Sequence, residues 1–216
     1  MTQIVNGIHL PDRDTHFREQ ILNNPIVEGK GTYQYAKIDA ALKICKNRNF
    51  AIDIGANVGL WTRLLAANFK RVVAIEPVME NVECLNHNID EDVNVEVAVV
   101  GISQLSGRLS LKWIDGTATA YVSAYEDRDF EVNCRPLDDF NFTYVDFIKI
   151  DVEGYENNVI KSAERTIRVY KPIIVVEQKK KTVRYDGYKF AAISRLAGWG
   201  MSIAWEMSGD YCLVWR

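Results

Sequence analysis

The fold is decided by one stretch of the sequence, Phe50-Ala51-Ile52-Asp53-Ile54-Gly55-Ala56-Asn57-Val58-Gly59. A short apolar run contains an acidic residue near its end, two glycines then frame a tight turn, and the segment 60–69 predicts a helix. A strand, a glycine turn and a helix in this order place a crevice for an anion or a nucleotide at the carboxyl end of a parallel strand. The stretch therefore predicts a ligand site as well as a fold.

The same strand–helix order repeats downstream of this stretch. Apolar runs and period-two alternation predict strands at 71–75, 93–100, 146–151 and 172–177. Helices are expected at 78–89, 157–170 and 189–196, the last closed by Gly198, and a hairpin is expected at 201–205 and 211–215. The sequence thus predicts an α/β fold, a doubly wound, mostly parallel, seven-stranded Rossmann-like sheet with a C-terminal antiparallel hairpin at its far side.

Two regions stand outside this repeat. Residues 1–49 are expected to form an N-terminal helical lead-in that covers the domain 50–216, with a helix at 33–45 capped by Thr32. Tyr33 and Gln34 have two possible placements. Both reach over the crevice, or Tyr33 packs on the sheet edge and Gln34 faces solvent. Residues 101–130 predict an inserted β element at 109–113, a turn at Asp115-Gly116 and a mobile loop, either a substrate lid or a surface loop.

Composition excludes several classes of protein. The 216 residues carry a net charge of −3, which argues against nucleic-acid binding driven by overall charge. No apolar run approaches the ~20 residues that cross a bilayer, so no membrane association is expected. Four scattered cysteines without a CxxC pair indicate free thiols in a reducing compartment, and the first residues lack the pattern of a signal peptide. These features predict a cytoplasmic protein.

Four acids mark the expected crevice. Glu76, Asp151 and Glu177 end predicted strands, and Asp53 precedes the first glycine. The carboxyl ends of parallel strands meet along one edge of an open sheet, so we expect these side chains to converge there.

The order of glycines distinguishes two ligands for this crevice. A dinucleotide requires G-x-G-x-x-G for its pyrophosphate, and that pattern is incomplete here. An acidic rim instead suits S-adenosylmethionine, which carries an ammonium and a sulfonium but no phosphate. Glu76, ~20 residues after the turn, is placed to accept hydrogen bonds from both ribose hydroxyls. A nicotinamide-dependent oxidoreductase is therefore disfavoured.

Three segments resemble the FkbM family of S-adenosylmethionine-dependent methyltransferases. They are Asp53-Ile-Gly-Ala-Asn-Val-Gly59, Ile75-Glu-Pro77 and Phe147-Ile-Lys-Ile-Asp-Val-Glu-Gly-Tyr-Glu156, within a similarity that spans roughly residues 50–178. The resemblance implies a class I methyltransferase sheet and methyl transfer to a hydroxyl of a sugar or other small metabolite. A non-catalytic module that retains the cofactor pocket is the alternative from a different class.

The resemblance also implies roles for single residues. The methionine part and the turn would be held by Asp53, Gly55, Asn57 and Gly59, the ribose by Glu76, and the adenine by residues 99–103, with Ser103 at their end.

Asp151 and Glu153 would lie on the acceptor side. Asp151 is the first candidate for a general base or orienting group and Glu153 the second. Asp151 alternatively binds only the cofactor's ammonium, and Glu153 alternatively caps the following helix. The two acids do not make a full ligand set, so no metal site is predicted. The run Lys179-Lys180-Lys181 with Arg184 is either a solvated face or a contact for a phosphate-bearing substrate.

Overall fold

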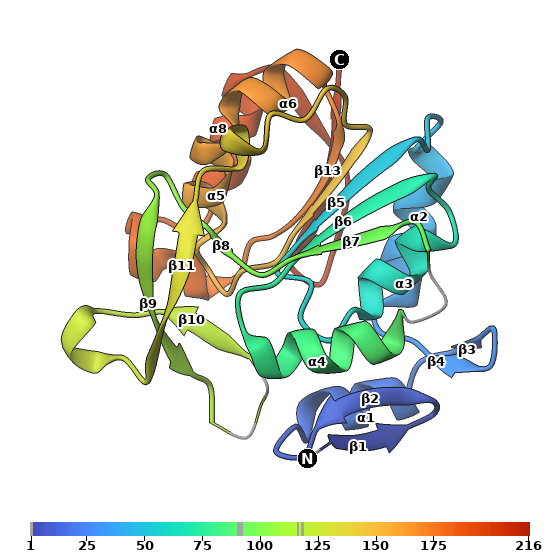
Figure 1. Cartoon of the computed structure of the whole chain (residues 1–216). Helices are drawn as coiled ribbons and strands as arrows, with labels where there is room; N and C mark the ends of the chain where they lie inside the picture. Colours follow the sequence, from blue (N-terminus) through green and yellow to red (C-terminus); the bar gives the residue numbers. More distant parts are fainter. Residues whose placement is uncertain (1, 90–92, 116, 118) are drawn as a thin grey trace.

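The computed structural model describes residues 2–89, 93–115, 117 and 119–216. Its centre is a seven-stranded sheet with the order β14-β15-β13-β12-β5-β6-β7, flanked by helices on both faces (Figure 1). All neighbours from β13 to β7 pair in parallel, and β15 runs antiparallel to both β13 and β14. The strands are β5 (Phe50–Ile54), β6 (Arg71–Ile75), β7 (Val95–Ala98), β12 (Phe147–Ile150), β13 (Ile173–Glu177), β14 (Met201–Met207) and β15 (Asp210–Trp215).

The predicted fold is confirmed. The C-terminal antiparallel hairpin lies at one side of the sheet as expected, with β15 next to β13 and β14 at the edge. The helices that follow the strands are α3 (Leu60–Ala66), α4 (Met79–Asn88), α5 (Glu156–Ser162), α6 (Glu164–Tyr170), α7 (Val183–Asp186) and α8 (Ala191–Gly198). Within the described ranges, no helix combines the length and the apolar character that a bilayer crossing requires.

Alternation along the strands divides the core into two layers. Phe50, Ile52 and Ile54 of β5 face one layer with residues of α5, α6 and α8. Ala51 faces the other layer, where it joins residues of α2 (Tyr35–Ile44) and α3. Both layers are buried, as expected when helices cover the two faces of a parallel sheet.

Several predicted boundaries shift. Helix α2 begins at Tyr35, because Thr32 donates to the carbonyl oxygen of Pro25 at 2.5 Å and does not cap the helix. The predicted strand 93–100 divides into β7 and the short β8 (Gly101–Ile102), which belongs to another sheet. Gly198 is the last residue of α8 rather than a residue beyond its end.

The predicted helix 157–170 is two helices, separated at Ala163. Asp138 explains the break, because its carboxylate accepts from the backbone N–H groups of Arg165 and Thr166, both at 2.9 Å. It also accepts from the Thr166 hydroxyl at 2.7 Å. A side chain remote in the sequence thus satisfies the free N–H groups of a new helix start.

The segment 1–49 contains more β structure than a helical lead-in. Besides α1 (His16–Leu22) and α2, it forms the hairpins β1 (Thr2–Val5) with β2 (Ile8–Pro11) and β3 (Ile26–Val27) with β4 (Lys30–Gly31). Asn6-Gly7, with φ of 46° and 74°, is a recognised hairpin turn and the signal that the sequence analysis missed. Asn88 of α4 fixes the first hairpin by exchanging hydrogen bonds with the backbone of His9 at 2.7 and 3.0 Å.

The insertion is a separate sheet of order β10-β9-β11-β8 (Figure 1). Its strands β9 (Gly107–Trp113), β10 (Ala120–Val122) and β11 (Phe130–Arg135) extend past the predicted limit at residue 130. Gly116 of the predicted turn lies outside the described residues. Arg13 links this sheet to the N-terminal segment and to α4, since its guanidinium stacks on the Trp113 ring at 3.4 Å and pairs with Glu80 at 2.6 Å.

Candidate functional site

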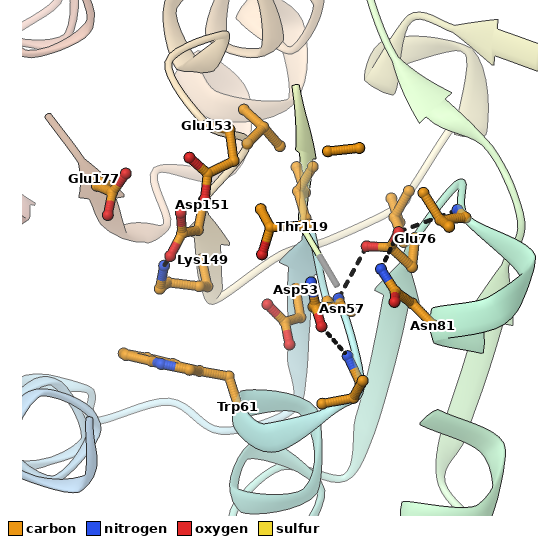
Figure 2. A pocket seen from close by; sticks show the side chains of 18 of the residues that line it. Asp53, Asn57, Trp61, Glu76, Asn81, Thr119, Lys149, Asp151, Glu153 and Glu177 are labelled. Carbon is orange, nitrogen blue, oxygen red and sulfur yellow. Dashed lines mark hydrogen bonds and ion pairs between the residues drawn. The ribbon is translucent and has the colours of Figure 1, made fainter. Parts of the chain in front are cut away.

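A cavity of about 560 Å³ opens at the carboxyl ends of β5, β6 and β12. This volume lies in the usual range for small-molecule sites. The start of α2 and helix α1 border it on one side, and β9, β10 and β11 of the inserted sheet border it on another. Figure 2 shows the polar side chains that enter it from the strand ends. Tyr33 and Gln34 both line the cavity, in agreement with the first of their two predicted placements.

The glycine turn brings two strands into close contact. Gly55 has a φ of +78°, and a Cβ there would lie 1.9 Å from the carbonyl oxygen of Asp151. Gly59 (φ +84°) is the N-cap residue directly before α3, and a Cβ there would lie 3.1 Å from the Leu85 side chain. Glycine is needed at Gly55 for both conformation and space. The two predicted halves of the site therefore touch each other directly.

Glu76 is tied to the glycine turn from the end of β6. Its carboxylate accepts from the backbone N–H groups of Asn57 at 2.9 Å and Val78 at 3.0 Å (Figure 2). Asn57 adopts the left-handed conformation with φ 51°, which directs its N–H to this carboxylate. Burial raises the pKa of Glu76 to about 7, against the lowering effect of these hydrogen bonds.

Asp53 is a second buried carboxylate on the cavity wall. The Thr62 hydroxyl donates to it at 2.7 Å from the first turns of α3. Burial raises the pKa of Asp53 to about 6, although Thr62 and Lys149 both lower it. Two carboxylates that are costly to ionise thus face the same cavity, where hydroxyl donors or a cationic ligand would stabilise their charge.

Lys149 is the central cation of the site and is fully buried. Its ammonium lies 3.0 Å from Asp151, 3.9 Å from Asp210 and 5.0 Å from the centre of the Trp61 ring. Burial alone would lower the pKa of Lys149, but the nearby carboxylates raise it above its usual value. For Asp151, burial is outweighed by Lys149, and its pKa falls below the usual range. Asp151 is therefore an ionised carboxylate.

Glu153 and Glu177 complete the acidic side of the cavity. Lys181 pairs with Glu153 and lies 3.5 Å from Glu177, which also pairs with Lys179. Both lysines line the cavity and pair with its acids, while more than a third of each side chain remains exposed. Within the described part of the chain, Glu153 does not cap the following helix. The turn is instead closed by Glu156, which accepts from the backbone N–H of Gly154 at 2.8 Å.

The opposite end of the cavity is apolar. Its lining comes from the ends of β6 and β7, from β8 and from the inserted sheet. The apolar residues there are Ile75, Val78, Val100, Ile102, Leu109, Leu111, Val122 and Val132. Such a surface suits a flat, weakly polar ring.

Some of the predicted cofactor residues line the cavity and others lie behind its wall. Asp53, Gly55, Asn57 and Glu76 line the cavity together, while Gly59 shapes the turn behind them. Ser103 is not among the lining residues, and its hydroxyl lies 3.2 Å from that of Tyr155, which does line the cavity. The predicted acceptor residues Asp151 and Glu153 also line it.

Sequence reasoning missed Lys149 and Asp210. A lysine between two isoleucines in a strand has no sequence signal of burial beyond its apolar neighbours, and Asp210 looked like a turn residue. Asn81 was also missed, although it follows Glu76 by five residues and donates to it at 3.4 Å.

The sheet order and the position of the cavity define the class I methyltransferase fold. Two solved structures share it over most of their length. An rRNA methylase from Streptococcus thermophilus has 12% identity and a TM-score of 0.51. The matched region covers 84% of this chain and 95% of the methylase. A precorrin-6y C5,15-methyltransferase from Geobacter metallireducens GS-15 has 14% identity and a TM-score of 0.52. The matched region covers 91% of this chain and 97% of that protein. At these identities the likeness concerns the fold alone.

Within this class, the model of the Methyltransferase FkbM domain matches residues 53–197, and the chain belongs to the FkbM methyltransferase family. The structure of methyltransferase FkbM from Methylobacillus flagellatus KT is similar, with 19% identity and a TM-score of 0.54 over 78% of this chain. This chain spans only 44% of the length of that protein. No curated protein sequence matches the chain significantly.

Proposed function

We propose that this protein transfers a methyl group from S-adenosylmethionine to a hydroxyl oxygen of a small molecule, a sugar or another natural product. The observation that carries the proposal is the position of Glu76. Its buried carboxylate lines the cavity at the end of β6, next to the glycine turn and between the polar and the apolar ends. Ribose hydroxyls are donors that satisfy such a carboxylate, and a pyrophosphate is an anion that it repels.

The residues present fit S-adenosylmethionine along the whole cavity. The apolar end accommodates an adenine ring, which Val100, Gly101 and Ile102 flank. Ser103 does not reach the ring itself, but its hydroxyl positions that of Tyr155, which lines the cavity. Glu76 accepts from the ribose hydroxyls. At the polar end, Asp53 offers a negative charge to the ammonium and the sulfonium. Bound cofactor supplies an electrophilic methyl group at that point.

The acceptor then lies between the cofactor and the carboxylates after β12. Methyl transfer needs the acceptor oxygen in line with the carbon–sulfur bond. Asp151, held ionised by Lys149, accepts a hydrogen bond from the acceptor hydroxyl and orients its lone pair. Asp151 is also the first candidate to take up the proton of that hydroxyl, and Glu153, beside Lys181, is the second candidate.

Cofactor identity is tested by thermal shift. S-adenosylhomocysteine is expected to raise the unfolding temperature, and NAD is expected to leave it unchanged. Stabilisation by NAD alone would overturn the proposal.

Transfer is tested with labelled S-adenosylmethionine and a panel of hydroxylated sugars and metabolites. Asp151→Asn keeps the shape of the side chain, and we expect it to lower kcat by at least about 100-fold while S-adenosylhomocysteine still stabilises the protein. Glu83→Gln, an exposed acid on α4, is the matched control. Cofactor binding without transfer to any hydroxyl would identify a non-catalytic module instead.

A further inference from the structure

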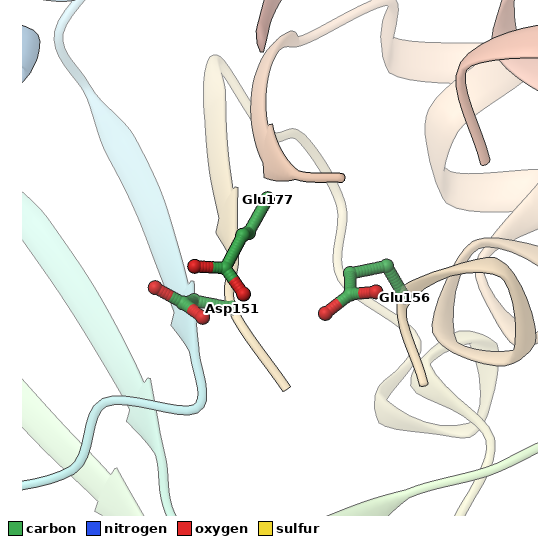
Figure 3. A group of neighbouring side chains, drawn as sticks. All are labelled: Asp151, Glu156 and Glu177. Carbon is green, nitrogen blue, oxygen red and sulfur yellow. The ribbon is translucent and has the colours of Figure 1, made fainter. Parts of the chain in front are cut away.

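Three carboxylates outside the cofactor contacts form a compact cluster. Asp151, Glu156 and Glu177 each place an oxygen within 4.8 Å of an oxygen of the other two (Figure 3). They come from three places, the end of β12, the start of α5 and the end of β13. Glu156 and Glu177 are buried and Asp151 is partly buried. The acceptor-side cavity is lined by Asp151 and Glu177.

One acid of this cluster, Glu156, differs from its neighbours in its ion pairs. Each of the other acids has a lysine partner, since Lys149 pairs with Asp151, Lys179 with Glu177 and Lys181 with Glu153. Among the described residues, no lysine or arginine forms an ion pair with Glu156. Glu156 therefore has no cationic partner, and an ionised carboxylate in this buried place would be costly unless a cation joined it.

Glu156 supplies the second observation. Its side chain is fully buried, and only Oε1 is used, as acceptor from the backbone of Val152 and Gly154. Its other oxygen, Oε2, is buried without a hydrogen-bond partner. Figure 3 shows the carboxylate of Glu156 directed toward those of Asp151 and Glu177. A buried acceptor aimed into an acidic cluster is the arrangement expected of a ligand atom for a cation.

We propose that Asp151, Glu156 and Glu177 bind one hard divalent cation, such as Mg²⁺, Mn²⁺ or Ca²⁺, on the acceptor side of the site. Oxygens on opposite sides of a Ca²⁺ ion at about 2.4 Å lie about 4.8 Å apart, and those around Mg²⁺ lie up to about 4.2 Å apart. Three oxygens that lie within 4.8 Å of one another are at most about 2.8 Å from a common centre, so the cluster must contract by up to about 0.4 Å at each ligand for Ca²⁺ and by up to about 0.7 Å for Mg²⁺. Carboxylate oxygens are the preferred ligands of all three ions.

The role of this cation rests on the proposed methyltransferase function. An acceptor hydroxyl that binds the same ion would release its proton more readily and would be fixed in position for transfer. A polyhydroxylated acceptor with two adjacent oxygens suits such a site best, because it can chelate the ion.

A proton on Glu156 is the competing way to remove the uncompensated charge, since burial raises the pKa of this residue to about 8. The two explanations differ in what Glu156→Gln does. Glutamine keeps the oxygen that accepts from Gly154, so the variant is expected to fold. It imitates a protonated glutamate but removes a charged metal ligand.

The test is Mn²⁺ binding to the full chain, followed by electron paramagnetic resonance without cofactor or acceptor. We expect one Mn²⁺ per chain with Kd at or below about 1 mM, displaced by Mg²⁺ or Ca²⁺. Glu156→Gln and Glu177→Gln should each weaken binding at least about fivefold, while Glu83→Gln should change it less than twofold.

Failure of wild-type protein to bind Mn²⁺, or a smaller loss in Glu156→Gln, would overturn the metal site. The thermal shift with S-adenosylhomocysteine is independent of this result. A protein that binds S-adenosylhomocysteine but not Mn²⁺ would retain the proposed function and lose the metal. The reverse pattern would keep the metal site and contradict the cofactor.

Discussion

The backbone carbonyl of Asp151 occupies the space where a side chain at Gly55 would begin. A Cβ on Gly55 would lie 1.9 Å from that oxygen, far inside any contact distance. The turn after β5 and the turn after β12 are therefore packed against each other through backbone atoms. This contact fixes the separation between the proposed cofactor residues and the proposed acceptor residues.

Gly55→Ala should destabilise the protein strongly and weaken binding of S-adenosylhomocysteine. Two costs add, a left-handed conformation of about 1 to 2 kcal/mol and a backbone displacement of about 1 to 3 kcal/mol. Gly29→Ala is the matched control, because Gly29 has a φ of +75° and no atom within 4 Å of the added Cβ. Urea unfolding should show the larger loss for Gly55→Ala. Equal losses would mean that space at Gly55 does not matter.

In the protein without ligand, ionisation of Glu76 should lower the free energy of unfolding as the pH rises. Its pKa is about 7 in the folded state against an ordinary value of 4.5, because burial disfavours the charged form, and nearby Asp53 raises it further. The folded protein thus holds a proton that the unfolded chain releases between pH 4.5 and 7. The free energy of unfolding should fall by on the order of 3 kcal/mol at most across that window. Urea titrations at a series of pH values should show a flatter profile for Glu76→Gln, with Glu83→Gln resembling wild type.

Binding of S-adenosylhomocysteine should show the opposite dependence on pH. Ribose hydroxyls donate hydrogen bonds, so they favour the ionised carboxylate of Glu76. Affinity is expected to rise up to about tenfold per pH unit below 7 and to level off above it. Isothermal titration calorimetry measures this directly. A wild-type affinity that stays constant from pH 5.5 to 8 would contradict the assignment of Glu76 to the ribose.

Lys149→Met should be among the most damaging substitutions in the chain. It leaves Asp53, Asp151 and Asp210 without their shared buried cation, and breaking a buried pair typically costs about 3 to 5 kcal/mol. Lys43→Met removes an exposed pair with Asp39 on α2 and should not change stability measurably. The comparison uses thermal and urea unfolding. Equal stability of the two variants would show that the three acids adapt without Lys149.

Much of the fold follows from local patterns in the sequence. Strand β6 coincides with its predicted range 71–75, because the apolar run 72–75 lies between Arg71 and Glu76-Pro77, which leaves little freedom in its bounds. The break between α5 and α6 was not predictable, since it depends on Asp138, which only the fold brings to Arg165 and Thr166. The first hairpin was predictable as well, because Asn6-Gly7 is a typical two-residue hairpin turn.

In the candidate site, too, some residues could be predicted from local sequence patterns and others depend on tertiary contacts. Asp53, Glu76 and Asp151 were found because acids at strand ends converge in this fold. Lys149 and Glu156 were not assigned, since their roles depend on partners that tertiary packing selects. The Lys149 side chain reaches Asp210 across the sheet, and Glu156 turns back on the preceding turn.

Asp210 has a further consequence for how the site is assembled. It lies at the start of β15 and pairs with Lys37, 173 residues earlier, on the other side of Lys149. A contact between positions this far apart closes a long loop, which costs conformational entropy of the chain. The floor of the site is therefore complete only when the first and last parts of the domain have met. A chain without β15 would keep the glycine turn and Glu76 but would lose Asp210, the acid that lies against both Lys37 and Lys149.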